Sequence, residues 1–271
     1  MPDQSLQDLS WRDPSLSDAP FLWQGSPDRA CLLLHGLGGG IYQLRWLAQH
    51  LHQQGLTVQG INFPGHGIPV EEMPPSTWPE WYEHSRAAYE QLCERYAQVS
   101  VLGFSTGCVV ALHLAAQMSA IQKPPEQMVL LSPFMAIKRL WFTGLPLEFY
   151  VQTLGGVVKS APRRHLAIAD REIRALGEKV DRTRTFNLIS VQSALQLIGK
   201  VKQTLPQITT PTLIIQSSQD SVVDPPGAQY LYENLGSPLK TLQWLHHSDH
   251  IITMDRERQQ VFEWVGSFLE S

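Results

Sequence analysis

A serine between two glycines is the residue of this chain whose type and setting most directly indicate chemistry. An apolar, β-branched run leads into Gly103-Phe104-Ser105-Thr106-Gly107, and a run rich in alanine and leucine at helical spacing follows. A G-x-S-x-G pattern between a strand and a helix is typical of a nucleophile elbow. The sharp reversal strains the serine backbone, and glycine leaves the room that the turn needs. The pattern predicts a projecting, nucleophilic Ser105; the alternative is an ordinary serine in a glycine-flanked turn.

A nucleophilic serine needs a base that accepts its proton, and the base needs an acid that orients it. In a parallel sheet such groups follow the carboxyl ends of strands. Asp220 lies four residues after a predicted strand that ends at Gln216, and His250 lies five residues after one that ends at Leu245. The order serine, acid, histidine along the chain is the one found with this kind of elbow.

Other side chains near predicted strand ends compete for the same roles. Asp224 follows the same strand as Asp220 but stands directly before two prolines, which favours a place at the start of a helix. His246 and His247 lie nearer to their strand than His250 does. The further candidates are His35, His66 and Asp249. Position and order together favour Asp220 and His250.

The elements that must position these residues alternate between strands and helices, which predicts a mostly parallel α/β sheet flanked by helices. Near-continuous apolar runs are typical of strands buried on both faces. The predicted strands lie at about 20–24, 29–34, 57–62, 99–104, 127–132, 210–216 and 239–245, and predicted helices at about 41–54, 77–97, 226–235 and 256–269, besides the one after Ser105. Gly55 is expected to end the first helix, and Thr77 to cap the second.

From 133 to 206 the alternation stops, and the segment has helical but no strand character. We interpret it as a helical cap and a return helix, inserted into a core formed by 1–132 and 207–271. The first half is apolar from Phe134 and Met135 to Leu154, and the second half is charged from Arg163 to Arg184. The apolar half either packs on the core or lines an acyl pocket, which would favour medium- or long-chain esters. Such a cap could also touch a membrane surface.

Composition narrows the function further. The 271 residues carry a net charge of −4 and no basic run, which argues against a nucleic-acid partner. The sequence predicts neither a transmembrane segment nor a signal peptide. The three cysteines, Cys31, Cys93 and Cys108, are predicted to be reduced core residues, which fits a cytoplasmic location. No zinc-like spacing and no dinucleotide motif is present, so neither a metal nor a cofactor is expected. The oligomeric state is not predicted.

The chain resembles the α/β-hydrolase superfamily and, more narrowly, its bacterial carboxylesterase and monoacylglycerol lipase branch. Besides the elbow, the motifs are His35–Gly39, Pro64–Gly67 and the stretch from Gln216 to Phe268, and the likeness extends over the chain from about Phe21. The segment 248–258 is nearly a signature of the branch, which places its base at His250. The acid of the branch stands about thirty residues earlier, at Asp220. One departure is Cys108, where the branch usually has a second glycine.

The resemblance implies a serine hydrolase with the α/β-hydrolase fold and a Ser105–His250–Asp220 triad that needs no cofactor. The backbone N–H groups of Thr106 and Leu37 would form the oxyanion hole, and His35 and His66 would hold their loops. The expected substrates are small acyl esters, cleaved through an acyl-enzyme. Two alternatives stay open: an amidase, peptidase or thioesterase with the same three residues, or a protein of this fold that only binds a ligand.

Overall fold

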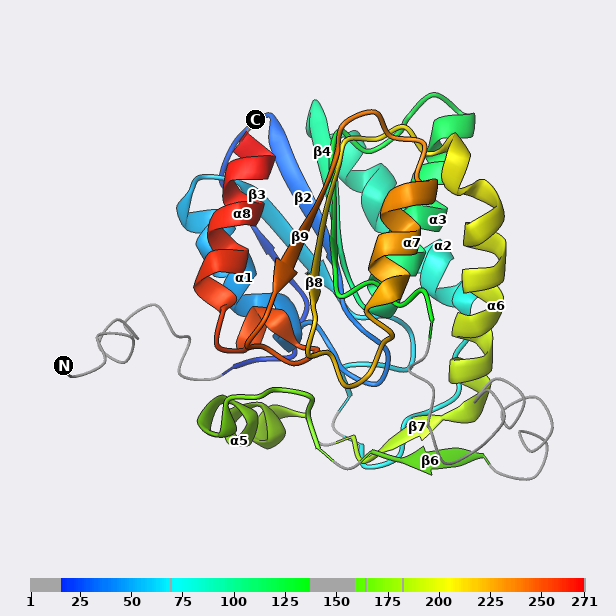
Figure 1. Ribbon diagram of the computed structural model, residues 1–271. Helices are drawn as coiled ribbons and strands as arrows, with labels where there is room; N and C mark the ends of the chain where they lie inside the picture. Colours follow the sequence, from blue (N-terminus) through cyan, green and yellow to red (C-terminus); the bar gives the residue numbers. More distant parts are fainter. Residues whose placement is uncertain (1–15, 69, 137–158, 164, 182, 271) are drawn as a thin grey trace.

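The computed structural model describes residues 16–68, 70–136, 159–163, 165–181 and 183–270. A seven-stranded sheet with strand order β1-β3-β2-β4-β5-β8-β9 runs through the centre (Figure 1). Strand β1 pairs antiparallel with β3, and all other neighbours pair parallel. The strands are β1 (Phe21–Trp23), β2 (Arg29–Leu34), β3 (Thr57–Ile61), β4 (Gln98–Phe104), β5 (Met128–Leu131), β8 (Thr212–Ser217) and β9 (Lys240–Leu245). The predicted mostly parallel α/β sheet is confirmed.

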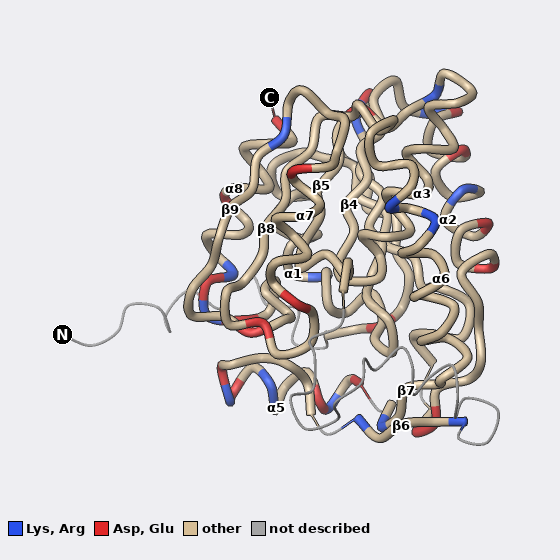
Figure 2. The backbone as a smooth tube through the Cα atoms, turned by 45° about the vertical axis from the view of Figure 1, so that its right-hand side comes forward, with Lys and Arg blue, Asp and Glu red and all other residues tan. Residues whose placement is uncertain are grey.

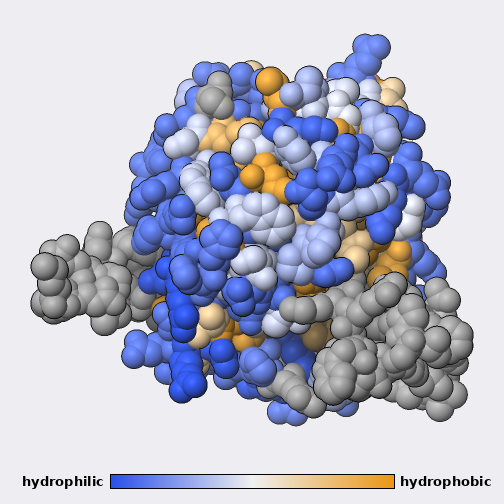
Figure 3. All heavy atoms as spheres, viewed as in Figure 1, coloured by the Kyte–Doolittle hydropathy of each residue, from blue (hydrophilic) through white to orange (hydrophobic). Residues whose placement is uncertain are grey.

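Helices cover both faces of this sheet (Figure 1). One face carries α1 (Tyr42–Gln53) and α8 (Arg258–Glu270), and the other carries α2 (Trp78–Cys93), α3 (Thr106–Ala120), α6 (Leu188–Thr204) and α7 (Pro226–Asn234). Two clusters of buried apolar side chains therefore form, one on each face, and their burial supplies most of the driving force for folding. The outer surface in Figure 3 is largely hydrophilic with scattered hydrophobic residues, as expected for this layering.

Local signals in the sequence account for the helix boundaries. Helix α1 ends before Gly55, whose φ of 89° is the left-handed conformation that glycine adopts at low cost. Helix α2 begins after Thr77, whose N–H and hydroxyl both donate to the carboxylate of Glu80, at 2.7 and 2.6 Å. Both helix ends lie where they were predicted.

The inserted segment differs from its prediction. It contains two short antiparallel strands, β6 (Ser160–Pro162) and β7 (Thr185–Asn187), so the expectation of no strand character is wrong. Each strand has three residues, too few for an alternating pattern to be read. Helix α5 (Arg171–Val180) and these strands lie across the carboxyl edge of the main sheet (Figure 1). Helix α6 returns to the core, where Ala194, Leu197 and Val201 are buried.

The cysteines follow their prediction only in part. Cys31 and Cys108 are buried free thiols, as expected. Cys93 is exposed; it is the last residue of the amphipathic helix α2, whose buried side includes the neighbouring Leu92. Among the helices of the described ranges, none combines the length and apolar character that crossing a bilayer requires.

Candidate active site

Ser105 lies in a sharp turn between β4 and α3. Its backbone has φ 53° and ψ −115°, a conformation that costs a non-glycine residue about 1–3 kcal/mol. The flanking glycines allow the turn, because a Cβ on Gly103 would lie 2.5 Å from the carbonyl oxygen of Gly107, and one on Gly107 would collide with the backbone of Leu34. Cys108 is fully buried, with its sulfur 3.1 Å from the carbonyl oxygen of Gly103. A thiol therefore fits beneath the elbow in place of the second glycine.

Three side chains from distant parts of the chain meet at the carboxyl edge of the sheet. The Nε2 atom of His250 lies 3.0 Å from Oγ of Ser105, and its Nδ1 atom lies 2.8 Å from Oδ2 of Asp220. A carboxylate only accepts hydrogen bonds, so Nδ1 carries the proton and Nε2 is free to accept the serine hydroxyl. All three side chains are buried. This is the geometry of a nucleophile, a base and an orienting acid.

The loop after β8 fixes the carboxylate of Asp220. Its Oδ1 atom accepts the N–H groups of Val222 and Val223 at 2.8 and 2.9 Å, and Oδ2 also accepts the side-chain amide of Gln216 at 3.0 Å. Burial raises the pKa of Asp220, but the neighbouring His250 and these backbone donors outweigh burial and bring the pKa below its ordinary value. Asp220 is therefore ionised at neutral pH.

The histidine loop, residues 246–257 after β9, is held by its own carboxylates. Asp255 is fully buried, and its two oxygens accept four backbone N–H groups, those of Asp249, Arg256, Ala169 and Asp170. The last two donors precede α5, so Asp255 also ties the histidine loop to the inserted segment. Ser132, which directly follows β5, donates its hydroxyl to the carbonyl of His250 at 2.8 Å. These contacts fix the backbone that carries the imidazole.

The glycine loop, residues 35–41 after β2, runs beside the nucleophile. A Cβ on Gly36 would lie 3.2 Å from Cβ of Ser105. Leu37 follows directly, and Thr106 is the first residue of α3, where a helix leaves its N–H without an internal carbonyl partner. Gly36, the residue before Leu37, thus lies beside Ser105, and Thr106 follows Ser105 directly in the chain. That the N–H groups of Leu37 and Thr106 form an oxyanion hole stays a prediction.

His35 holds the peptide unit that contains the N–H of Leu37. The N–H of Phe63 donates to Nε2 of His35 at 3.0 Å, so Nδ1 carries the proton and donates to the carbonyl of Gly36 at 2.8 Å. Burial, together with the neighbouring His66, lowers the pKa of His35 to about 3. The ring therefore stays neutral and keeps this tautomer at neutral pH.

The competing residues lie apart from the nucleophile or serve its surroundings. His246 and His247 are exposed; Nδ1 of His246 lies 3.1 Å from Oγ of Ser218, and the N–H of His247 donates to Glu257. Asp224 precedes α7, as its position before the prolines suggests. The structure brings neither of these histidines to Ser105. It also includes one site residue that sequence reasoning did not single out, Asp255, because four backbone donors to one carboxylate leave no sequence pattern.

Further positions proposed from the sequence lie in the core or outside the described residues. Phe134 and Met135 are buried, with Met135 against Gly227 of α7. The apolar positions from 140 to 154 lie outside the described residues. His66, in the loop after β3, is buried with Nδ1 3.0 Å from the carbonyl oxygen of Pro64.

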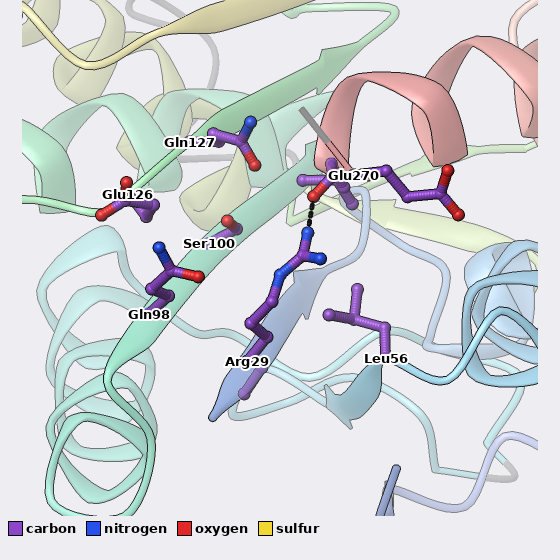
Figure 4. Close-up of a pocket in the computed structure, with 9 residues that line it drawn as sticks. Arg29, Leu56, Gln98, Ser100, Glu126, Gln127 and Glu270 are labelled. Atoms are coloured by element: carbon purple, nitrogen blue, oxygen red, sulfur yellow. Dashed lines mark hydrogen bonds between the residues drawn. The ribbon is translucent and has the colours of Figure 1, made fainter. Parts of the chain in front are cut away.

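One hollow lies at the opposite, amino edge of the sheet (Figure 4). Arg29 at the start of β2 donates to the carbonyl of Leu269, and Gln127 donates to that of Phe268 at 2.8 Å. These donors satisfy carbonyls that the last turn of a helix leaves unpaired. We assign this hollow to the anchoring of α8 rather than to substrate binding.

Comparison with known proteins agrees with this fold and identifies the family of the chain. The family described as "Serine aminopeptidase, S33" matches residues 25–257. A carboxylesterase of Bacillus subtilis (strain 168) is 27% identical over 254 residues, which cover 93% of this chain and 96% of that protein. A thermostable monoacylglycerol lipase of Bacillus sp. (strain H-257) is 28% identical over 257 residues, covering 94% of this chain and 96% of that protein.

Among solved structures, one from a study of the metagenome-derived lipolytic enzymes LipS and LipT superimposes with a TM-score of 0.81. It is 23% identical and covers 95% of this chain and 98% of its own, so it supports the fold. The family match extends over most of the chain and includes Ser105, Asp220 and His250. The chain belongs to the serine aminopeptidase S33 family, within the carboxylesterase and monoacylglycerol lipase branch of the α/β-hydrolases.

Proposed function

We propose that this protein hydrolyses carboxylic esters with Ser105 as nucleophile, His250 as base and Asp220 as orienting acid. The observation that carries the proposal is the pair of contacts at His250, 3.0 Å to the serine Oγ and 2.8 Å to the aspartate Oδ2. Relatives named a carboxylesterase and a monoacylglycerol lipase support esters as the substrate class.

The reaction has two steps. Nε2 of His250 accepts the hydroxyl proton while Oγ of Ser105 bonds to the ester carbonyl carbon, and the carbonyl oxygen becomes negative. The N–H groups of Leu37 and Thr106 donate to this oxyanion. When the intermediate collapses, the bond to the alkoxy group breaks, and that group takes the proton from Nε2 and leaves as an alcohol.

Water completes the cycle. It loses a proton to Nε2 of His250 as it attacks the acyl carbon, and the second intermediate releases the carboxylic acid and restores the hydroxyl of Ser105. Asp220 has two tasks throughout: it keeps the proton on Nδ1, and its negative charge stabilises the imidazolium that forms twice per turnover.

The proposed substrates are esters of medium- or long-chain acids, including monoacylglycerols, with the segment 133–206 acting as a cap over the site. The name of the second relative supports this choice, as does the apolar composition of the segment between Phe134 and Leu154. Small-molecule sites are lined mainly by apolar side chains.

Rates on p-nitrophenyl esters with acyl chains from two to sixteen carbons, and on monoacylglycerols, test this function. We expect hydrolysis by the wild type, loss of it in Ser105→Ala, and the highest kcat/KM at medium or long chains. A steep preference for acetate would contradict the proposed acyl chains. Failure to cleave every ester in the panel would contradict the function itself.

Amide cleavage is a second candidate, because the matching family is described as a serine aminopeptidase. An aminopeptidase needs a free carboxylate for the substrate ammonium. Of the carboxylates beside the described part of the site, Asp181 is paired with Arg163 at 2.7 Å, and Asp249 accepts the N–H groups of Ser221 and His250. We therefore expect aminoacyl p-nitroanilides to be cleaved far more slowly than esters, and a higher kcat/KM on the anilides would reverse the assignment.

A further inference from the structure

An arginine of the inserted segment reaches into the glycine loop. Arg163 directly follows β6; its Nη1 atom donates to the carbonyl of Gly38 at 2.5 Å, and its Nη2 atom donates to Oδ2 of Asp181 at 2.7 Å. The side chains of Arg163 and Asp181 are 10% and 4% exposed. A guanidinium offers several donors in one rigid plane, so a single side chain can hold a carbonyl and a carboxylate together.

A third buried residue closes this arrangement. The hydroxyl of Tyr42 donates to the same Oδ2 atom of Asp181 at 2.7 Å, and the N–H of Thr183 donates to Oδ1 at 3.0 Å. Tyr42 is the first residue of α1 and stands directly after the glycine loop. We call Tyr42, Arg163 and Asp181 the bracket, because together they connect the inserted segment to both the middle and the end of that loop.

Gly38 is clamped from the same side. Its φ is 70°, and a Cβ at this position would lie 2.6 Å from the ring of Phe186 in β7. The guanidinium of Arg163 lies over that ring, 5.6 Å from its centre. Arg163 and Phe186 therefore fix the backbone one residue beyond Leu37.

We propose that Arg163 is a positioning residue for the oxyanion hole, which it serves by holding the carbonyl of Gly38 and so the N–H of Leu37. This inference rests on the ester hydrolysis proposed above. His35 holds the start of the glycine loop through Gly36, and Asn62 holds its end by accepting the N–H of Ile41 at 2.8 Å. Arg163 holds the middle.

A positioning role accounts for the buried ion pair of Arg163 and Asp181. Burying a guanidinium and a carboxylate costs desolvation energy that their attraction often fails to exceed, so such a pair is weak evidence for a purely stabilising role. An oxyanion donor, in contrast, must be in place before charge develops, and a displacement of about 1 Å can cost about a hundredfold in rate. No negative group is added near the oxyanion, because Asp181 is neutralised by its partner.

The test compares Arg163→Lys and Arg163→Met with a matched pair, Arg174→Lys and Arg174→Met. Arg174 lies in α5 of the same inserted segment, and its Nε and Nη2 atoms donate to the carbonyl of Ile168 at 2.8 and 2.5 Å, away from the glycine loop. Lysine at 163 keeps a positive charge for Asp181 but lacks the rigid, planar set of donors that a guanidinium offers. We expect kcat on a p-nitrophenyl ester to fall about tenfold in Arg163→Lys and about a hundredfold in Arg163→Met, with KM within twofold of the wild type.

Two further readouts separate positioning from simple loss of stability. An alkyl trifluoromethyl ketone, which Ser105 converts into a hemiketal oxyanion, should lose affinity in parallel with kcat in the Arg163 variants. The pH dependence of kcat/KM should keep its midpoint, because His250 and Asp220 are untouched. Both Arg174 variants should keep kcat and ketone affinity within twofold.

The proposal is overturned if folded Arg163 variants keep kcat within twofold, or if kcat falls while ketone affinity does not. Should both variants fail to fold by circular dichroism, Tyr42→Phe takes their place, because it removes one hydroxyl from the bracket without a change of volume. It should lower kcat and ketone affinity together by about threefold, and an unchanged kcat there would equally overturn the proposal. If the wild type itself cleaves no ester, that result contradicts the proposed ester hydrolysis, and the role assigned to Arg163 is contradicted with it.

Discussion

The histidine loop and the glycine loop both follow strands of the main sheet, yet the charged side chains that contact their backbones differ. Backbone N–H groups of the histidine loop donate to carboxylates, chiefly Asp255 and Glu257. Carbonyls of the glycine loop accept from cationic or neutral donors, Arg163 at Gly38 and His35 at Gly36. Acidic residues accordingly gather in the loops after β8 and β9 (Figure 2).

This difference matches the charges that the proposed reaction creates. The imidazole of His250 becomes positive during each step, and nearby carboxylates favour that state. The carbonyl oxygen of the substrate becomes negative beside the glycine loop, where N–H donors stabilise it. Substitutions beside the histidine loop and beside the glycine loop should therefore lower activity in different ways.

The largest effect is expected at the acid. Asp220→Asn can donate from its amide to Nδ1 of His250 and so favours the wrong imidazole tautomer, in which Nε2 cannot accept the serine proton. We expect kcat to fall about 10⁴-fold with KM little changed. Steady-state kinetics with a p-nitrophenyl ester measure this loss. Asp224→Asn, four residues further along the same loop, is the control, and its kcat should stay within twofold of the wild type. A loss below tenfold in Asp220→Asn would contradict the assigned role.

On the oxyanion side, His35→Phe should have the next largest effect. The ring fits the buried site but offers no donor to the carbonyl of Gly36 and no acceptor to the N–H of Phe63. We expect kcat to fall about 10- to 100-fold, and His35→Gln, which can restore one donor and one acceptor, to recover part of that loss. Kinetics measure the loss, and circular dichroism on the same samples checks that the variants fold. Equal activity of both variants and the wild type would rule out the role of His35 in holding the glycine loop.

A smaller catalytic effect with a large loss of stability is expected for Asp255→Asn. An asparagine has one acceptor oxygen, so part of the set of four backbone donors loses its partner. The free energy of unfolding should fall by roughly 3 kcal/mol, and kcat by about tenfold, as His250 loses its fixed backbone. Glu257→Gln is the comparison variant, because Glu257 is partly exposed and accepts two backbone N–H groups rather than four, so its loss of unfolding free energy should be smaller. Urea denaturation measures both variants, and equal losses of unfolding free energy in Asp255→Asn and Glu257→Gln would contradict the role assigned to Asp255.

The smallest expected effect is a pH dependence of stability that comes from the neutral, buried histidines. Burial lowers the pKa of His66 to about 4, below its unfolded value of 6.5, so the unfolded chain binds more protons between these values. Stability is therefore full above pH 6.5 and falls as the pH drops toward 4. Asp18, whose pKa burial raises to about 6, acts in the opposite direction between pH 3.8 and 6.

Urea denaturation at pH 7 and pH 5 measures this effect. Between these pH values, His66→Gln should lose about 2 kcal/mol less unfolding free energy than the wild type. The exposed His84→Gln should behave like the wild type. Identical pH dependence in all three proteins would show that His66 is not held neutral.

The sheet was predictable because parallel strands buried on both faces leave continuous apolar runs, as in β2 and β8. The elbow at Ser105 was predictable because steric demands fix glycine at 103 and 107. For Asp220 and His250 the structure supplies the contacts, and their catalytic roles stay predictions. The strands β6 and β7 were not predicted, because three residues are too few to show an alternating pattern. The exposure of Cys93 was not predicted, because its position in the helix does not by itself show which face it lies on.

The bracket and the Asp255 contacts were beyond sequence reasoning for another reason. Tyr42 and Asp181 are 139 residues apart, and the donors to Asp255 include residues 85 and 86 positions away. Such pairs depend on how finished elements pack, and no local propensity encodes them. Composition marked the second half of the inserted segment as charged, but it could not tell a buried arginine from a solvated one.

Covalent labelling with a fluorophosphonate, followed by mass spectrometry of the peptides, tests the assigned nucleophile and its activation most directly. We expect one adduct on Ser105 in the wild type, no adduct in Ser105→Ala, and labelling at least about a thousandfold slower in His250→Ala. An adduct on a different residue, or labelling that persists in Ser105→Ala, would contradict the assignment of Ser105 and His250.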